Sequence, residues 1–111
     1  MRERLGSDLR RYRIEAGLTQ EELAAILGYD RPTPVSRHER LSTLPPLLIA
    51  ISYSVVFRKP IPELFPGLVE AVERATRERL AELATKFKGS ADATRESTKK
   101  LEWIARHSAI K

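Results

Sequence analysis

Side chains that could carry out acid–base or nucleophilic chemistry are few in this chain of 111 residues. It has two histidines, His38 and His107, which lie far apart in the sequence, and it has no cysteine. A glycine-rich phosphate loop, an HExxH segment and a pair of carboxylates on one buried helix face are all missing from the sequence. Ligands for a metal site are equally scarce. We therefore expect no enzyme activity, no metal and no cofactor.

Arginine and lysine are the abundant polar side chains. The 20 Lys and Arg outnumber the 15 Asp and Glu, so the formal net charge is +5. Residues 1–66 hold ten basic and eight acidic side chains, and residues 67–111 hold ten and seven, so the excess is spread along the chain. A net positive charge favours a polyanionic partner.

The cellular compartment follows from what the sequence lacks. A chain without cysteine has no disulfide framework and fits a reducing cytoplasm. The longest apolar run, LPPLLIAISYSVVF at residues 44–57, is short of the roughly 20 residues that a bilayer demands, and we interpret it as a core segment. The charged N-terminal residues do not resemble a secretory signal. We expect a cytoplasmic protein without a membrane partner.

The first half of the chain predicts short helices. Leu5, Leu9, Tyr12 and Ala16 share one helical face, and Gly17 ends that helix. Thr19 and Glu22 form an S/T-x-x-E capping box, so a second helix begins at Gln20, and Gly28 closes it in a left-handed conformation.

Prolines punctuate the segment that follows. Residues 29–34, YDRPTP, predict a turn, and a third helix follows with Thr33 as its cap and Pro34 as its first residue. Pro45 and Pro46 begin a fourth helix in the same way, and KPIP at residues 59–62 breaks it before a short turn. Residues 1–66 are thus predicted to form five short helices.

The sequence changes in character from residue 67 onward, where strong helix formers dominate. A helix of about five turns carries a stripe that includes Val69 and Val72. A last helix would bury Leu101, Ile104 and Ala105 beside Trp103.

Residues 5–40, LGSDLRRYRIEAGLTQEELAAILGYDRPTPVSRHER, resemble the helix-turn-helix core of the Xre/Cro/phage-repressor family. Three marks carry the resemblance: the R-x-x-x-G-L-T-Q-E-E-L-A entry at 13–24, the turn at Leu27 and Gly28, and the V-S-R-x-E-R exit at 35–40. ELFPG at 63–67 is similar to the ending of many such domains. The resemblance implies an all-α protein, with a five-helix lambda-repressor-like helix-turn-helix domain over residues 1–66 and one or two C-terminal helices in residues 67–111.

A physical reason for this spacing exists without the family. A helix of about two turns, a tight turn and a second crossing helix let the first helix lie over the DNA backbone while the second enters the major groove. Ala24 is small where the helices cross, Gly28 lets the chain reverse, and Val35 fills the crevice between the helices.

The resemblance also implies roles for individual residues. Gln20 would contact a phosphate near the positive end of its helix, with a solvated first-turn residue as the alternative. Arg37 would reach a base edge, where arginine pairs with both acceptors of guanine. Arg13 and Glu39 match the family's structural ion pair, and His38 is interpreted as a packing residue. The remaining expected DNA contacts are Thr33 and Ser36 at short range and Arg31 and Arg40 at flanking phosphates.

The sequence departs from the family pattern in two places. One extra residue lies between Gly28 and Val35, and Pro32 and Pro34 stand where a reading helix ordinarily begins, so we expect that helix to be short and to start late. Leu41 stands where a glycine usually follows E-R.

The leading prediction is a sequence-specific DNA-binding transcriptional regulator, a repressor that reads the major groove of double-stranded DNA as a homodimer. The alternative is an antitoxin-like or other protein-binding module whose C-terminal helices bind a partner protein. A third possibility is an interaction domain that has lost its DNA affinity. The residues expected in the dimer or partner contact are Val72, Leu80, Leu83, Phe87 and Trp103, and an intramolecular helical hairpin docked on the core is their alternative role.

Overall fold

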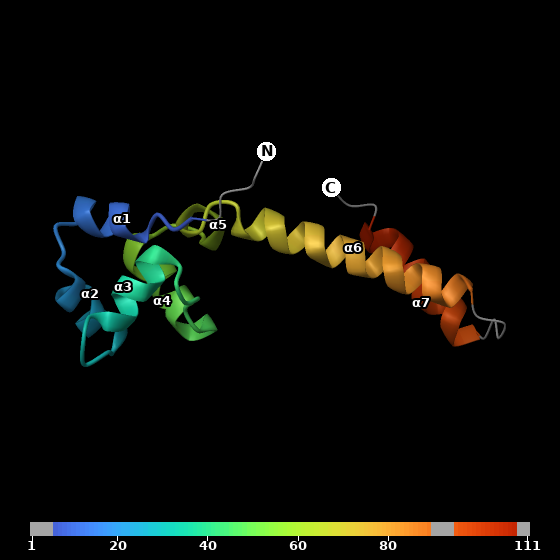
Figure 1. Cartoon of the computed structure of the whole chain (residues 1–111), viewed down its shortest axis with the longest axis horizontal. Coiled ribbons are helices and arrows are strands. Elements are labelled where there is room, and N and C mark those ends of the chain that lie inside the picture. Colours follow the sequence, from blue (N-terminus) through green and yellow to red (C-terminus); the bar gives the residue numbers. More distant parts are fainter. Residues whose placement is uncertain (1–5, 90–94, 109–111) are drawn as a thin grey trace. The chain divides into compact units, whose positions relative to one another are not determined.

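The computed structural model describes residues 6–89 and 95–108, and every regular element within these ranges is a helix (Figure 1). The all-α prediction is therefore confirmed for the described residues. The chain divides into two compact units, residues 1–69 and 70–111. Helices α1 to α5 belong to the first unit. The second unit contains most of α6 together with α7.

Five helices build the first unit around one small core. Helices α1 and α2 pack on α3 and α4, and α5 packs on α4. The fully buried core side chains come from all five helices and the residue after α5, which explains why so short a segment folds as one unit. The helices are α1 (Leu9–Glu15), α2 (Gln20–Leu27), α3 (Thr33–Arg40), α4 (Leu47–Phe57) and α5 (Ile61–Leu64), and the core residues are Leu9, Leu23, Ala24, Val35, Tyr53, Leu64 and Phe65.

Helix α1 is shorter than the sequence pattern predicts. The backbone N–H of Gly6 donates to the carbonyl of Pro66 at 3.3 Å, and that of Asp8 donates to the carbonyl of Leu64 at 2.9 Å. These bonds hold residues 6–8 against the end of α5 in a non-helical conformation, so the helix begins at Leu9. Leu5, which we expected on the same helical face as Leu9, lies outside the described residues.

Helix α2 begins and ends as its sequence predicts. The backbone N–H of Glu22 donates to Thr19 Oγ1 at 3.0 Å, and the backbone N–H of Thr19 donates to Glu22 Oε1 at 2.9 Å. This second bond is the main cause that lowers the pKa of Glu22. Gly28 takes the left-handed conformation with φ of 90°, and the capping box and the glycine C-cap are both confirmed.

The start of α3 differs from the prediction by one residue. Pro32, not Thr33, is the capping residue, and its carbonyl accepts the first helical bond from Ser36 N–H at 3.0 Å. Thr33 and Pro34 are the first two residues of the helix. The missing N–H of Pro34 costs nothing there, because first-turn N–H groups have no partner within the helix.

Helix α4, in contrast to α3, begins one residue later than predicted, because Pro46 is its extended cap with ψ of 156°. The interpretation of residues 44–57 as a core segment is confirmed for one face of α4 and wrong for the other face. Tyr53 is fully buried and Ile49, Val56 and Phe57 pack against the core, whereas several leucine, isoleucine and valine side chains of α4 are exposed. A helix at the edge of a five-helix unit buries one face, so the other face remains at the surface.

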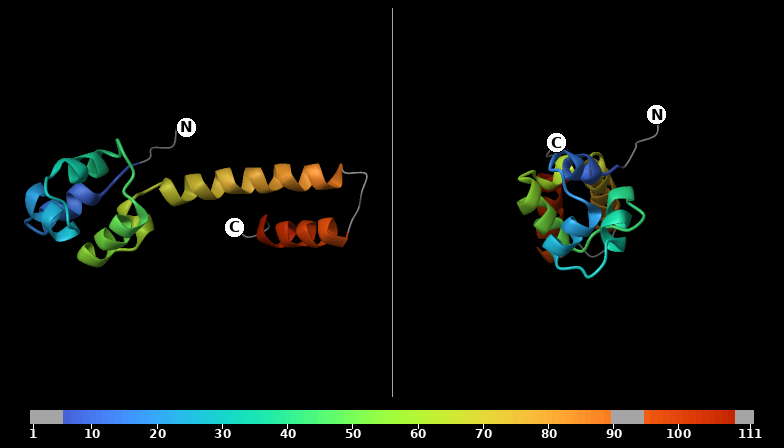
Figure 2. Two further views of the ribbon diagram at one scale, coloured as in Figure 1. Left: turned by 90° about the horizontal axis from the view of Figure 1, so that it is seen from below. Right: turned by 90° about the vertical axis from the view of Figure 1, so that its left-hand side faces the viewer.

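The second unit is a helical hairpin of α6 (Leu68–Lys88) and α7 (Arg95–Ser108), which lie side by side (Figure 2). Ile104 is buried between them at 4% exposure. The expected burial of Ala105 is wrong, since its side chain is exposed, and Leu101 is half-buried. Two helices meet along a single line, so one row of side chains is covered. No helix within the described ranges is long and apolar enough to cross a membrane.

Replacement of Thr19 by alanine tests the capping box. Since Thr19 satisfies an N–H group at the start of α2, we expect Thr19→Ala to lower the free energy of unfolding by about 1 kcal/mol. Chemical denaturation would measure this change. Thr43→Ala removes the same hydroxyl from an exposed loop residue and serves as the matched control. Equal losses for the two variants would contradict a stabilising role of the cap.

Candidate nucleic-acid interface

The crossing of α2 and α3 positions the candidate reading helix. Leu23 and Ala24 of α2 and Val35 of α3 are at most 1% exposed. The small side chain of Ala24 allows the helices to approach, and Val35 fills the space between them. These contacts fix one face of α3 against the rest of the unit, as the sequence pattern predicts.

A buried ion pair ties α3 to α1. Arg13 Nε lies 2.5 Å from Glu39 Oε2, and Arg13 Nη2 donates to Glu39 Oε1 at 3.2 Å. The side chains are 12% and 3% exposed, respectively. Arg13 Nη1 also donates to the carbonyl of Leu18 at 3.0 Å, in the loop that precedes α2. The two residues that the resemblance pairs are thus in bidentate contact.

Gln20 joins this network through a contact that the sequence pattern does not predict. Its Nε2 donates to Glu39 Oε1 at 3.0 Å, so the side chain is half-buried and is not simply solvated. An amide nitrogen carries two hydrogens. One hydrogen serves Glu39 and the other is left for a further acceptor at the start of α2.

His38 completes the buried face of α3. It is 3% exposed, and its Nδ1 lies 2.9 Å from the hydroxyl oxygen of Tyr53 on α4. Its ring meets that of Tyr53 edge to face, with centroids 5.7 Å apart. Burial lowers the pKa of His38 and, acting first among several causes, raises that of Tyr53. The structure therefore bears out the interpretation of His38 as a packing residue and adds a hydrogen bond to it.

The opposite face of α3 is polar and accessible. Thr33, Arg37 and Arg40 are exposed, and Ser36 is half-buried. Arg40 Nε donates to the carbonyl of Ser36 at 3.3 Å, which lays the guanidinium along the helix. Arg31 is exposed in the turn before the helix. The structure thus brings four of the six expected DNA-contacting residues together on one helix and sets the other two, Arg31 and Gln20, beside it.

The end of α3 is closed by an unusual residue. Leu41 has φ of 54°, in the left-handed region, where a side chain costs about 1–2 kcal/mol. Its N–H donates to the carbonyl of His38, and Ser42 N–H donates to that of Arg37 at 3.0 Å. The Leu41 side chain packs against the core, which offsets the strain. Leucine therefore does here what a glycine commonly does.

The second unit offers a different surface. Of the five residues expected in a dimer or partner contact, Val72, Leu83 and Trp103 are exposed by 56%, 41% and 48%, and Leu80 and Phe87 are half-buried. Trp103 stacks on His107 with ring centroids 3.9 Å apart. Lys100 Nζ lies 5.4 Å from the centroid of the Phe87 ring. No residue of α6 is buried, so its apolar stripe is covered incompletely by α7.

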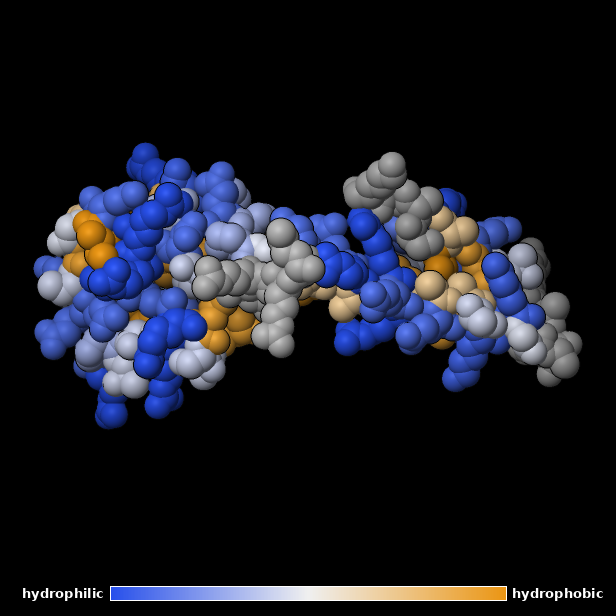
Figure 3. All heavy atoms as spheres, turned by 45° about the horizontal axis from the view of Figure 1, so that its top comes forward, coloured by the Kyte–Doolittle hydropathy of each residue, from blue (hydrophilic) through white to orange (hydrophobic). Residues whose placement is uncertain are grey.

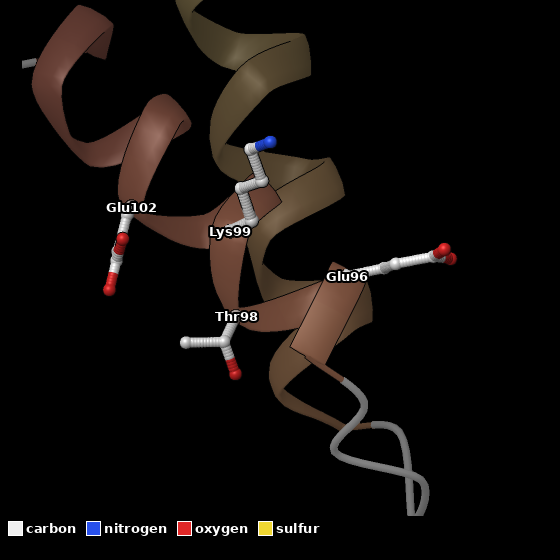
Figure 4. A pocket seen from close by; sticks show the side chains of 4 residues that line it. All are labelled: Glu96, Thr98, Lys99 and Glu102. Atoms are coloured by element: carbon white, nitrogen blue, oxygen red, sulfur yellow. The ribbon is translucent and has the colours of Figure 1, made fainter.

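A depression on α7 is lined by Glu96, Thr98, Lys99 and Glu102. Its side chains do not converge on a common point where a ligand could bind. Figure 4 shows these side chains pointing in different directions from one helix. Carboxylates and a lysine alternate in it, so it favours neither an anion nor a cation. Among the described residues, no group of three or more His, Asp or Glu side chains is placed to hold a metal ion.

These features define a helix-turn-helix protein of the DNA-binding class. A family model described as a helix-turn-helix matches residues 9–64, about half of the chain. The chain belongs to this family, the Xre/Cro/phage-repressor-like proteins, which are DNA-binding transcriptional regulators. The match also confirms the lambda-repressor-like fold of the first unit with helices following it. A comparison with curated proteins finds no match.

Replacement of Glu39 tests the buried ion pair. Glu39→Ala strands the Arg13 charge in a nearly buried site, so we expect it to lower the free energy of unfolding by about 3–5 kcal/mol. The double variant Arg13→Met with Glu39→Leu replaces both charges by apolar groups, so its free energy of unfolding should fall much less than that of Glu39→Ala. Glu73→Ala, which breaks a surface pair with Arg77 on α6, should change stability by less than about 0.5 kcal/mol. A double variant as unstable as Glu39→Ala would contradict this account.

A pH series tests His38. Its folded-state pKa lies below the ordinary value of 6.5, so below that pH the unfolded chain binds more protons than the folded chain does. The contribution of neutral His38 to the free energy of unfolding is fully present above pH 6.5. This free energy should fall as the pH drops below 6.5 toward the folded-state pKa of His38. Denaturation at pH 7.5, 6.0 and 5.0 should show a smaller fall for His38→Gln than for wild type. His107→Gln, which changes an exposed residue, should behave as wild type, and equal slopes for all three proteins would refute the assignment.

Proposed function

We propose that this protein represses transcription by binding a specific DNA site with α3 in the major groove. The observation that best supports the proposal is the division of α3 into two faces. Val35, His38 and Glu39 are buried and hold the helix in place, while Arg37 projects from the accessible face with Thr33. A helix fixed on one side and polar on the other suits the reading of base edges.

Each exposed side chain is assigned a contact by its chemistry. Arg37 pairs with the O6 and N7 acceptors of a guanine, and Thr33 and Ser36 make short contacts to neighbouring groups. Arg31 and Arg40 bind flanking phosphates. Gln20 uses its second amide hydrogen for a phosphate at the start of α2, where the helix dipole favours an anion.

The site is read by a homodimer in this proposal. One helix of eight residues spans few base pairs, so two copies on half-sites roughly 34–36 Å apart supply the needed specificity. The incompletely covered stripe of the second unit is assigned to contact between copies. A bound dimer then represses by occupying a promoter. The residues of this stripe are Val72, Leu80, Leu83, Phe87 and Trp103.

One observation favours a second candidate function, in which the hairpin binds a different protein, as an antitoxin-like module does. The exposed Trp103 belongs to a residue type that anchors protein interfaces, and Val72 adds exposed apolar surface to the hairpin. In this case the first unit would still bind DNA, and the hairpin would gain a partner other than a second copy.

Selection of DNA fragments by the purified protein tests the main proposal. Wild type should select one palindromic motif, and Arg37→Ala should relax one position in each half-site by about 1–3 kcal/mol. Gln20→Ala should weaken binding to all sequences alike and leave the dependence on salt concentration unchanged, because a neutral amide releases no counterions. Binding constants for fragments that match the motif and for fragments changed at one position separate these two effects.

Two controls accompany the selection. Because Gln20 also contacts Glu39, unfolding of Gln20→Ala must be measured to show that the folded fraction is unchanged. Arg77→Ala removes an arginine from the second unit and should leave the motif intact. Weak, salt-dependent binding by wild type without any sequence preference would overturn direct reading by α3.

A further inference from the structure

The outer face of α4 carries most of the exposed large hydrophobic residues described in the first unit, and the proposed function leaves it unused. Leu47, Leu48, Ile51 and Val55 are exposed by 75%, 77%, 48% and 71%, and Leu44 in the preceding loop is exposed by 61%. We call these five residues the α4 face. Hydrophobic residues reach the surface of both units (Figure 3). Monomeric proteins rarely leave large contiguous apolar surface in water.

The α4 face is also free of charge. Residues 44–57 contain no Asp, Glu, Lys or Arg. Ser52 Oγ donates to the carbonyl of Leu48 at 2.9 Å, and Ser54 Oγ donates to that of Lys59 at 2.6 Å. The helix thus satisfies its own hydroxyl donors, and covering it would leave neither of them without a partner. The face offers no charged group to a charged partner, whereas another apolar face is complementary to it.

The spacing of the exposed residues suits helix packing. Leu47, Ile51 and Val55 are four residues apart and form one i±4 ridge along the helix. Such ridges interdigitate with the same ridge of another helix at a crossing angle of about −50°. In a two-fold contact centred on Ile51, Leu47 of one copy would lie near Val55 of its partner.

The size of the face agrees with a contact between two copies. If a fully accessible Leu, Ile or Val residue offers roughly 170 Å², the exposed parts of the five residues amount to about 560 Å² on each copy. Complete burial on two copies would cover about 1,100 Å², just above the roughly 1,000 Å² that a biological interface should clear. We infer that the α4 face binds the α4 face of a second copy of this chain across a two-fold axis.

This inference rests on the proposed homodimer and adds to it a contact made by the first unit itself. A contact close to the reading helices restricts how the two copies of α3 are oriented, which a contact through the second unit alone does not do. Its test contains no DNA, so its failure is distinguishable from a failure of DNA reading by α3.

Cross-linking of single-cysteine variants of the full chain tests the contact. The chain has no cysteine, so Ile51→Cys introduces a unique thiol at the centre of the face. Ile26→Cys is the matched control, because Ile26 on α2 is also an exposed isoleucine, at 55%. With a short bis-maleimide, Ile51→Cys should form covalent dimers at least tenfold faster than Ile26→Cys.

A second pair of variants tests the face without a change of the reporter thiol. Val55→Glu in the Ile51→Cys chain places a carboxylate in the contact and should slow cross-linking at least tenfold, while Ile26→Glu in the same chain should not. Both changes fall on exposed side chains, so both proteins should fold. Cross-linking of Ile51→Cys no faster than the control would overturn the inference.

Reaction with a monofunctional maleimide then identifies what covers the face instead. If Ile51→Cys does not cross-link and reacts slowly, another part of the same chain covers the face. If it does not cross-link and reacts as fast as Ile26→Cys, nothing covers the face in the isolated protein. Both results count against a second copy as its partner.

Discussion

The buried ion pair between Arg13 and Glu39 is the interaction on which the geometry of the first unit depends. It joins α1 to α3, while the same arginine holds the loop before α2 and the same carboxylate holds Gln20 at the start of α2. Two charges in a nearly dry site are tolerable because they satisfy each other with two hydrogen bonds. Apolar packing alone is not directional. The bidentate ion pair is directional, and it fixes how α3 is rotated about its axis. That rotation decides which side chains face outward.

The prolines around α3 and α4 serve the same purpose by different means. Pro32 and Pro46 stand at helix caps and Pro34 in a first turn, positions where a missing N–H removes no helical bond. Their restricted backbones stiffen the turns that lead into the two helices. The extra residue between Gly28 and Val35 is accommodated within the turn, and α3 still buries Val35, His38 and Glu39. The longer turn between α2 and α3 therefore does not prevent α3 from burying one face in the core.

This protein has more apolar residues than its core can bury, and several of them remain exposed on α4 and on the hairpin. The core of the first unit is complete, yet α4 carries a second apolar face, and α6 has no buried residue. Small helical units close one core and have too little interior for a second. Surplus apolar residues at regular helical spacing are therefore best understood as contact surfaces. In these proposals, α3 reads DNA, and the copies associate through other elements, namely α4 and the hairpin of the second unit.

Much of this architecture was readable from local sequence. The capping box at Thr19 and Glu22, the left-handed Gly28, the five short helices and the long sixth helix follow from interactions between residues close in the chain, so short-range physics suffices to predict them. The family motif in turn paired Arg13 with Glu39. The starts of α3 at Thr33 and of α4 at Leu47 were each missed by one residue. The shorter α1 was missed because hydrogen bonds to the distant Leu64 and Pro66 hold the residues before it in a non-helical conformation. The hydrogen bond from Gln20 to Glu39, the partner of His38 and the two faces of α4 depend on which segments pack together, and only the tertiary structure decided them.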